Sequence, residues 1–420
     1  MYNKIEYPSK LRVIHVPNEA VESVTVLVLV EAGSRYETKE ISGIAHFLEH
    51  MFFKGAAKYT NPKEVTEALD SVGASYNAFT GKEYVGYYVK IRKTHVERAC
   101  DVLSDMLLAS RFEPEEIDKE RGVIYEEYNM YQDTPSAQVG WDFEQLVFGD
   151  QPLGWDQVGT KDTIYSLQRE DFIKYMDALY TPDNTVIVFS GNVSEKEVMS
   201  LMNTYFQFPE GEKARACLPV ELGKSNGRVH LTNKKTEQTH LILGGLSYDL
   251  HDERRTAAKV LASIMGGNMS SRMFQEVREQ RGLAYHISSY AESFIDTGLI
   301  YTHAGVTVDK IDQAIEAILE QYDDVVKNGV TDEELMKAKE YMKGRLTLSL
   351  EDTEEVAMYY AEHELMEKHI LPPSEYMKKI DAVTKDEIAH IAKELFARSR
   401  MYLAIIGPYE DKARFEKILG

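Results

Sequence analysis

Two stretches of the sequence share one layout: YTPDNTVIVFSG (Tyr180–Gly191) and FARSRMYLAIIG (Phe396–Gly407). Each begins with an aromatic residue, continues into an apolar run typical of a buried strand, and reaches a glycine that precedes a charged helical pattern. The two glycines are 216 residues apart, about half of the 420-residue chain. A layout that recurs at this offset predicts a chain built from two related halves.

The rest of the sequence agrees with this repeat. The early apolar run Thr25–Val30 has a counterpart at nearly the same offset in Thr239–Gly244. Each half combines strand-like and helical stretches, which predicts two α+β domains, each a mixed sheet with helices packed on it. We expect domains at residues 1–215 and 229–420, joined by a linker at 216–228, because this region is rich in Gly, Lys, Glu and Ser and lacks sustained periodicity.

Composition excludes several classes of function. The chain has 48 basic and 69 acidic residues, a net charge of −21 that repels polyanions, so no nucleic-acid partner is expected. The two cysteines, Cys100 and Cys217, are too few for a disulfide framework and are not spaced as metal ligands. The N-terminus lacks the apolar core of a signal peptide, and the early run Val24–Val30 is too short to span a bilayer. We therefore expect a cytoplasmic protein without a membrane partner.

A metal-binding pattern follows in the first half. The sequence from Gly43 is compatible with a helix, with Ser42 as its N-cap. Residues four apart on a helix point within about 40° of each other, so His46 and His50 converge and Glu49 flanks them. Two neutral imidazoles on one turn can chelate zinc, and the neighbouring carboxylate can take the proton of the attacking water. The alternative is a packed histidine pair with a solvated glutamate.

A catalytic zinc ion needs a third protein ligand, and the helical run Glu115–Tyr131 offers one. Glu120 and Glu127 are seven residues apart, about 20° from eclipsed, and they bracket an expected buried stripe. That stripe is formed by Ile117, Val123, Ile124 and Tyr131. A carboxylate aimed at a core needs a partner, so we assign Glu127 as the third ligand and Glu120 as the acceptor that fixes a histidine tautomer. A plain buried salt bridge is the alternative role for Glu120.

These residues resemble a known family. His46-Phe47-Leu48-Glu49-His50, followed 77 residues later by Glu127, resembles the inverted-motif zinc peptidases of the pitrilysin and insulinase type. The chain is most similar to their short members, which are related to the mitochondrial processing peptidase beta subunit, and the resemblance covers nearly its whole length. It implies one zinc ion per chain, with Glu49 as general base. It also implies that the two homologous domains form half of a clamshell, and that two such halves enclose a chamber for a peptide.

Two further matches depend on this resemblance. The segment Gly73–Thr80 resembles the family's edge strand, which implies that Asn77, Ala78 and Phe79 bind the substrate backbone as an added strand. Alone, this segment is a strand interrupted by glycine. The segment from Ser271 resembles the one in which the family carries an Arg and a Tyr seven apart, here Arg278 and Tyr285. The pair can stabilise an oxyanion or hold the substrate carbonyl. Without this resemblance, Arg278 and Tyr285 would be interpreted as an ordinary surface arginine and a tyrosine in a strand.

The resulting hypothesis is a zinc metalloendopeptidase that hydrolyses unstructured or presequence-like peptides. The second half has no His, Asp or Glu in residues 255–270, the window that aligns with the histidine motif, so only one half carries zinc. The resemblance implies a homodimer in which Arg278 and Tyr285 of one subunit approach the zinc ion of the other. Three alternatives stay open: a catalytic subunit that needs a metal-free homologous partner, a zinc-stabilised peptide-binding scaffold, and a non-hydrolytic iron enzyme.

Overall fold

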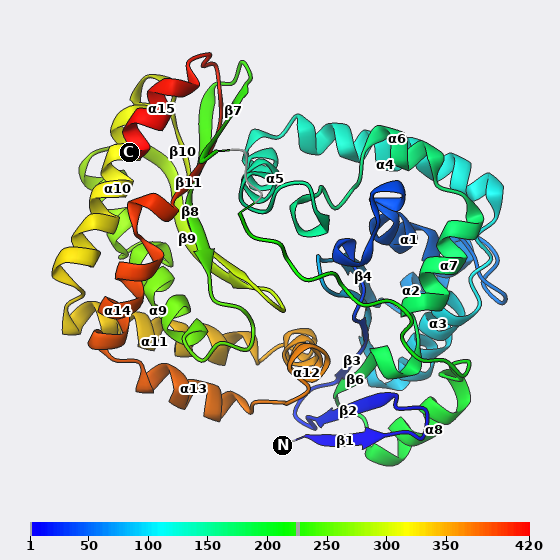
Figure 1. Ribbon diagram of the computed structural model, residues 1–420. Coiled ribbons are helices and arrows are strands. Elements are labelled where there is room, and N and C mark those ends of the chain that lie inside the picture. Colours follow the sequence, from blue (N-terminus) through cyan, green and yellow to red (C-terminus); the bar gives the residue numbers. More distant parts are fainter. Residues whose placement is uncertain (1, 224–226) are drawn as a thin grey trace. The chain divides into compact units, whose positions relative to one another are not determined.

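The computed structural model describes residues 2–223 and 227–420, which form two compact units (Figure 1). Unit 1 contains the residues up to Tyr128, Asp156–Leu218 and Thr347–Ile370. Unit 2 contains Asn129–Trp155, Pro219–Leu346 and Leu371–Gly420. The chain passes from unit 1 to unit 2 at Leu218, inside the expected linker 216–228, of which residues 224–226 lie outside the described part. Two segments lie in the unit formed mainly by the other half of the sequence: residues 129–155 belong to unit 2, and residues 347–370 belong to unit 1. A single division of the chain at this linker does not describe these exchanged segments.

Unit 1 is built on a six-stranded mixed sheet with the order β1-β2-β6-β3-β5-β4. Its strands are β1 (Asn3–Glu6), β2 (Arg12–Pro17), β3 (Ser23–Val30), β4 (Ser75–Thr80), β5 (Val85–Arg92) and β6 (Thr185–Gly191). β2 and β6 run parallel, and the other neighbours are antiparallel. β6 is buried along its whole length, as its continuous apolar run predicts for a strand covered on both faces.

Unit 2 has a five-stranded sheet with the order β7-β11-β8-β10-β9. Its strands are β7 (Val229–Asn233), β8 (Gln238–Ser247), β9 (Ala284–Ser293), β10 (Gly298–Thr307) and β11 (Tyr402–Gly407). The predicted repeat is visible in the pairing. β6 lies between a parallel neighbour, β2, and an antiparallel one, β3, and β11 lies in the same way between β7 and β8.

Helices cover both sheets. Those of unit 1 are α1 (Ile44–Phe52), α2 (Pro62–Asp70), α3 (Val96–Leu108), α6 (Lys161–Ser166), α7 (Arg169–Leu179) and α8 (Glu195–Tyr205), with α4 (Pro114–Gln132) continuing past the unit boundary. Those of unit 2 are α9 (Arg255–Gly266), α10 (Ile311–Asn328), α11 (Asp332–Ser349, which ends in unit 1), α13 (Pro373–Ala382), α14 (Lys385–Leu395) and α15 (Lys412–Leu419). The second face of each sheet is covered by one exchanged helix.

The exchanged helices are α5 (Pro135–Phe148) and α12 (Thr353–Glu367). α12 packs on β2, β3 and β6 of unit 1, where Ala357, Ala361 and Leu365 are fully buried. α5 comes from the first half of the sequence but packs on β8 and β11 of unit 2 (Figure 1). Each sheet has apolar side chains on both faces, and the helix that buries the second face comes from the other half of the sequence.

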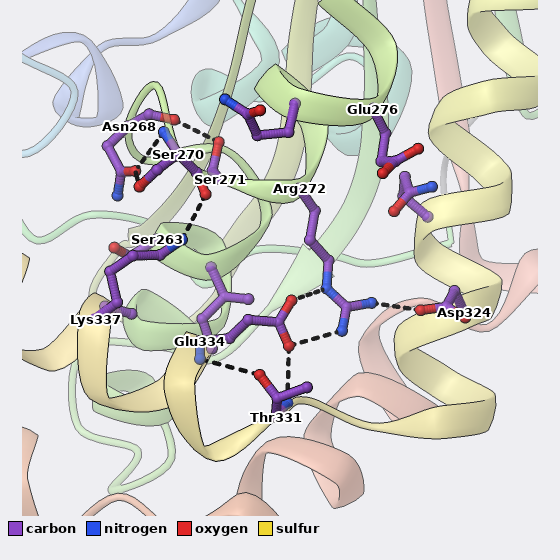
Figure 2. A pocket seen from close by; sticks show the side chains of 14 residues that line it. Ser263, Asn268, Ser270, Ser271, Arg272, Glu276, Asp324, Thr331, Glu334 and Lys337 are labelled. Atoms are coloured by element: carbon purple, nitrogen blue, oxygen red, sulfur yellow. Dashed lines mark hydrogen bonds and ion pairs between the residues drawn. The ribbon is translucent and has the colours of Figure 1, made fainter. Parts of the chain in front are cut away.

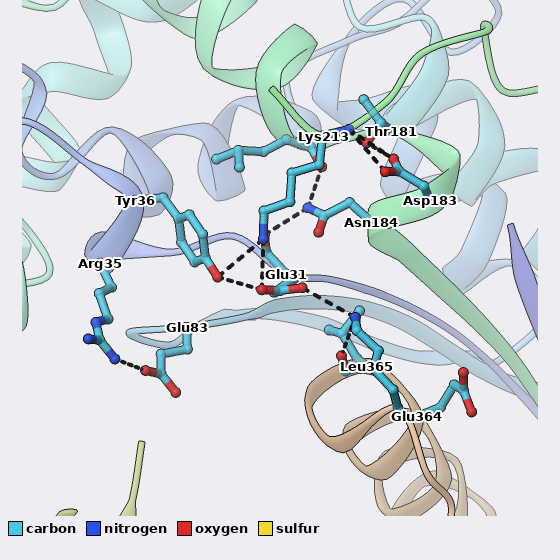
Figure 3. A network of polar contacts seen from close by, with 12 residues as sticks. Glu31, Arg35, Tyr36, Glu83, Thr181, Asp183, Asn184, Lys213, Glu364 and Leu365 are labelled. Carbon is cyan, nitrogen blue, oxygen red and sulfur yellow. Dashed lines mark hydrogen bonds and ion pairs between the residues drawn. The ribbon is translucent and has the colours of Figure 1, made fainter. Parts of the chain in front are cut away.

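Polar contacts fix the C-terminal end of α12 on unit 1 (Figure 3). The Glu364 carboxylate is almost fully buried and lies 2.7 Å from Lys4 Nζ and 3.7 Å from Arg12 Nη1. Just after β3, Glu31 pairs with Lys213 at 2.7 Å and with Lys368 at 3.4 Å. The facing cations offset part of the cost of burying these carboxylates, and the pairs join the C-terminal end of α12 to unit 1.

Candidate metal centre

Helix α1 carries the histidine motif and begins in a constrained way. Gly43 precedes the helix with φ +91°, and a Cβ there would lie 2.4 Å from the Val158 carbonyl oxygen. The expected N-cap at Ser42 is wrong, because Gly43 occupies that position. The free N–H groups of Gly43 and Ala45 instead donate to the buried Glu37 carboxylate, at 2.8 and 2.9 Å. Burial raises the pKa of Glu37 to about 8, against the opposing effect of these hydrogen bonds.

The apolar side of α1 packs into unit 1 and turns the histidines outward. Phe47, Leu48 and Phe52 are fully buried, and the Phe52 ring meets the Tyr87 ring of β5 edge-on, with centroids 5.1 Å apart. His46 and His50 then project together, with ring centroids 4.8 Å apart. The predicted convergence of the two imidazoles is therefore present.

Helix α4 brings a carboxylate to the same point. Glu127 Oε1 lies 3.5 Å from His46 Nε2, and Glu127 Oε2 lies 3.4 Å from His50 Nε2. Among the residues that the structure describes, these three form the one group of donors placed to hold a metal ion. The assumed position of Val123 on the buried stripe is wrong: its side chain is 53% exposed, whereas Ile124 is fully buried. Val123 and Ile124 lie on opposite sides of Glu127 on the helix, and only the Ile124 side faces the core.

Glu120 fixes the orientation of one imidazole. Its Oε1 lies 2.8 Å from His50 Nδ1, and its Oε2 lies 2.6 Å from Lys54 Nζ, while the carboxylate is 5% exposed. A hydrogen bond from Nδ1–H to this carboxylate leaves the Nε2 lone pair of His50 directed at Glu127. The Nδ1 of His46 is buried and has no hydrogen-bond partner within the described part of the chain. Of the two rings, only that of His50 is therefore oriented by a hydrogen bond at Nδ1 within the described residues.

Charges at this site favour an added positive charge. Burial alone would lower the pKa of His50, but Glu120 and Glu127 together raise it to about 9. The polar contacts with His46 and His50 hold the pKa of Glu127 well below its usual range. Burial opposes ionisation of Glu120, but His50 and Lys54 lower its pKa. Without a metal ion, a proton on the imidazole is therefore the cation that the carboxylates stabilise.

The donor set and its spacing fit zinc. A tetrahedral ion bound at about 2.0–2.1 Å from each donor holds those donors about 3.4 Å apart. Two separations are close to this value: His46 Nε2 lies 3.5 Å from one Glu127 oxygen, and His50 Nε2 lies 3.4 Å from the other. Both are longer than ordinary charge-assisted hydrogen bonds, and the three donor atoms all lie within 4.8 Å of one another. Two imidazoles and one carboxylate, with a position left for water, are a donor set of catalytic zinc sites.

Glu49 stands beside the metal ligands without belonging to them. Its Oε2 accepts a hydrogen bond of 2.6 Å from Thr80 Oγ1, at the end of β4. Thr80 was not singled out from the sequence, because only the fold brings this strand end to α1. The contact orients one oxygen of Glu49 and links the motif helix to the strand expected to bind substrate.

β4 lies at the edge of the unit 1 sheet, so only β5 pairs with it in the described chain. Asn77, Ala78 and Phe79 face Tyr88, Tyr87 and Gly86 of β5, respectively. Ala78 is buried and Asn77 is exposed. The Phe79 ring lies over Gly86, where a Cβ would come within 2.2 Å of it. The free edge of this strand offers backbone groups to an extended peptide.

Arg278 and Tyr285 belong to unit 2, whereas the metal centre belongs to unit 1. Arg278 and Tyr285 lie near each other within unit 2. The Arg278 guanidinium is 5.7 Å from the centre of the Tyr285 ring and 4.5 Å from that of the Phe274 ring. Tyr285 is 75% exposed, beside the point where the β9–β10 register shifts. It is therefore available to a ligand.

The segment that carries Arg278 is anchored at its start, beside a polar pocket of about 330 Å³ (Figure 2). Arg272 donates to Glu334 at 2.6 and 3.0 Å, to Asp324 at 2.7 Å and to the Gly329 carbonyl at 3.0 Å. These contacts satisfy the guanidinium and fix the beginning of the π-helical turn Phe274–Gln280. The role of Arg272 is thus structural.

Comparisons with known proteins show which family this chain resembles. The family model described as Insulinase (Peptidase family M16) matches residues 12–160, and the one described as Peptidase M16 inactive domain matches residues 166–342. The protein named Uncharacterized zinc protease YmxG of Bacillus subtilis is 37% identical over 399 residues, which are 95% of this chain and 96% of that protein. A Streptomyces coelicolor protein also named as a zinc protease is 36% identical over 411 residues, 96% of this chain and 89% of that one.

Solved structures show the same fold. A protease from Helicobacter pylori superposes with a TM-score of 0.90 at 21% identity, covering 97% of this chain and all of that one (100%). A chain of complex III2 from Candida albicans superposes with a TM-score of 0.84 at 18% identity, covering 99% of each chain. The two-domain α+β fold class is confirmed. In the described part of the chain, no helix combines the length and apolar character needed to cross a bilayer. The chain is a short, two-domain member of peptidase family M16, the insulinase or pitrilysin-type family.

Proposed function

We propose that this protein is a zinc metalloendopeptidase whose metal ion is held by His46, His50 and Glu127. The observation that carries the proposal is the spacing of 3.4 and 3.5 Å between the Glu127 oxygens and the two imidazole nitrogens. The hydrogen bond from His50 to Glu120 supports it, because it presents Nε2 as a ligand. The names of the relatives, zinc proteases, support the same metal and reaction class.

Zinc bound there supplies a Lewis acid that activates water and polarises the scissile carbonyl. Glu49 takes the proton from the attacking water on one carboxylate oxygen and returns it to the leaving amine nitrogen. The hydrogen bond from Thr80 occupies Oε2 of Glu49, so we assign the proton transfer to Oε1. Lys54 and Glu120 act indirectly, because they keep the His50 ring in one orientation.

The substrate we propose is an unstructured peptide. An extended chain can add to the free edge of β4 at Asn77–Phe79, next to the strand end that contacts Glu49. Main-chain hydrogen bonds of this kind require an extended backbone but no particular side chains. The net charge of −21 favours basic, presequence-like peptides over acidic ones.

We also propose that the active form is a cytoplasmic homodimer enclosing a peptide-sized chamber, in which Arg278 and Tyr285 of one subunit act at the other subunit's metal centre. The exposure of Tyr285 and its contact with Arg278 support a role in binding substrate. Mixing an inactive Glu49→Gln variant with an inactive Arg278→Ala variant should restore part of the activity. If mixing restores none, the shared site is wrong, and a catalytic subunit that requires a different homologous partner becomes the better description.

The function is tested by the Glu49→Gln variant. It should bind one zinc ion per chain like the unchanged protein and lose turnover of an unstructured peptide by at least 10²-fold, because general-base catalysis is removed. Glu126→Gln is the matched control, since Glu126 is an exposed acid next to a proposed ligand. Turnover retained in Glu49→Gln would disprove the assigned role.

A further inference from the structure

One short segment of unit 1 contacts both the helix that carries the histidine motif and the end of the edge strand β4. The segment is formed by residues 33–37, which lie between β3 and α1. At its C-terminal end, Glu37 accepts hydrogen bonds from Gly43 N and Ala45 N at the start of α1. Its N-terminal part packs on the turn 81–84, which connects β4 to β5. The segment therefore joins the start of α1 to the end of β4.

Backbone contacts hold the turn against this segment. Ser34 N donates to the Gly81 carbonyl oxygen at 3.3 Å, and Arg35 N donates to the Lys82 carbonyl oxygen at 2.9 Å. A Cβ at Gly33 would lie 2.4 Å from the Gly81 carbonyl oxygen, so the two backbones touch directly. The turn and the segment thus have a defined separation.

A buried ion pair reinforces this contact (Figure 3). The Arg35 guanidinium donates to the Glu83 carboxylate, and the two side chains are 1% and 6% exposed, respectively. Nη2 of Arg35 also donates to the Leu218 carbonyl oxygen at 3.3 Å. Separating two buried charges leaves each without its counter-charge in the interior, which is strongly unfavourable. The pair therefore resists any displacement of the turn from the segment.

The position of the turn bears directly on Glu49. Thr80 is the last residue of β4, and its Oγ1 donates to Glu49 Oε2 at 2.6 Å. Gly81, the first residue of the turn, follows Thr80 in the chain, so a displaced turn moves the threonine hydroxyl. The rest of β4 depends less on the turn, because its pairing with β5 continues to Ser75.

We propose that Arg35 and Glu83 are positioning residues for peptide hydrolysis: their ion pair fixes the β4–β5 turn, so that Thr80 holds Glu49 in one orientation. This inference rests on the proposed function, in which Glu49 is the general base. Both residues act through Thr80, and neither belongs to the metal-ligand group. Loss of the pair should therefore lower kcat, while zinc affinity and KM change little.

The test uses full-length variants in which the ion pair is replaced. In Arg35→Met/Glu83→Leu, apolar side chains fill the buried space, a replacement that often leaves stability unchanged. Its kcat for an unstructured peptide should fall by about tenfold or more, because small displacements of a catalytic group are costly. KM and zinc affinity should stay close to those of the unchanged protein. Glu83→Gln keeps an acceptor for Arg35 and should lose less kcat.

A double-mutant cycle shows whether the pair acts through Thr80. Thr80→Val removes the hydroxyl but keeps the shape of the side chain, so it should lower kcat by itself. Replacing the ion pair in the Thr80→Val background should then lower kcat no further. Glu364→Gln is the matched control, because Glu364 is also buried and ion-paired in unit 1, with Lys4 at 2.7 Å. Its effect on kcat should be the same with and without the Thr80 hydroxyl.

The proposal is overturned if Arg35→Met/Glu83→Leu keeps the kcat of the unchanged protein, or if its loss of kcat is equally large in the Thr80→Val background. Circular dichroism, thermal melting and zinc content identify a variant that has not folded, and Glu83→Gln then takes its place in the cycle. If the unchanged protein has no turnover, the proposed function and this inference fail together. Turnover with additive losses would disprove only the roles of Arg35 and Glu83.

Discussion

The two ring nitrogens of His50 have different roles. Nδ1 forms a hydrogen bond with Glu120, and this bond leaves Nε2 as the metal ligand. A Glu120→Gln substitution replaces the charged acceptor of Nδ1–H and removes the partner of Lys54, so Nε2 becomes a poorer ligand. We expect zinc affinity to fall by about 10–100-fold. Competition with a chelator of known affinity measures this, with the exposed Glu126→Gln as control. An unchanged affinity would leave Glu120 as only a partner in a buried salt bridge.

Zinc binding should depend on pH because His50 must be deprotonated to coordinate the ion. The pKa of His50 is raised to about 9 without metal, so below that pH the ring must lose a proton before it can coordinate. Binding therefore releases about one proton, and affinity should rise about tenfold per pH unit between roughly pH 7 and 9. Titration calorimetry in buffers of different ionisation enthalpy counts this proton. Zinc binding without proton release would contradict the coupling of His50 to Glu120 and Glu127.

The residues of the zinc motif could be predicted from the sequence, but the side chains that surround them could not. Helical spacing alone predicts that His46 and His50 converge. That Thr80 reaches Glu49, or that Val123 is exposed beside Glu127, depends on how α1, α4 and β4 pack, which spacing does not reveal. The sequence also favours Ser42 as the N-cap, because serine is a common one. The buried carboxylate of Glu37 takes that role from outside the helix.

The start of α1 should tolerate no side chain at Gly43. Gly43→Ala places alanine in a left-handed backbone conformation, which is unfavourable for it, and adds a Cβ 2.4 Å from the Val158 carbonyl oxygen. We expect the free energy of unfolding to fall by about 2 kcal/mol or more. Gly122→Ala in α4 is the control, since a Cβ there meets nothing within 4 Å, and it should raise stability by about 0.5–1 kcal/mol. Denaturant unfolding compares them, and equal stability of the two variants would refute this description of the α1 start.

The sequence repeat predicts two related units, but the exchange of helices between them is not predictable from it. Periodicity shows that α5 and α12 are helices but not which sheet each covers. Both helices cover apolar faces, that of unit 1 with Ile14, Leu27 and Val188 and that of unit 2 with Ile242, Leu299 and Ile406, so apolar character alone does not choose between them. The strands could be matched between halves because a buried strand has a continuous apolar run.

The exchange has a consequence for the separated halves. A fragment of residues 1–218 lacks α12 and carries α5 without its sheet, and 219–420 has the complementary defect. Each alone should aggregate or stay partly unfolded, because apolar faces remain uncovered. Co-expressed, the two should associate and recover zinc binding, as measured by size-exclusion chromatography and metal analysis. A cooperatively folded, zinc-binding 1–218 fragment would contradict the exchange.

We propose that this protein forms a working zinc centre without a different partner protein. The measurement that tests it most directly is cleavage of a long, unstructured basic peptide by the purified protein, first as isolated, then after chelation, and then with zinc restored. We predict cleavage that is lost with the chelator and recovered with zinc. An absence of cleavage despite one bound zinc ion at His46, His50 and Glu127 would contradict the claim.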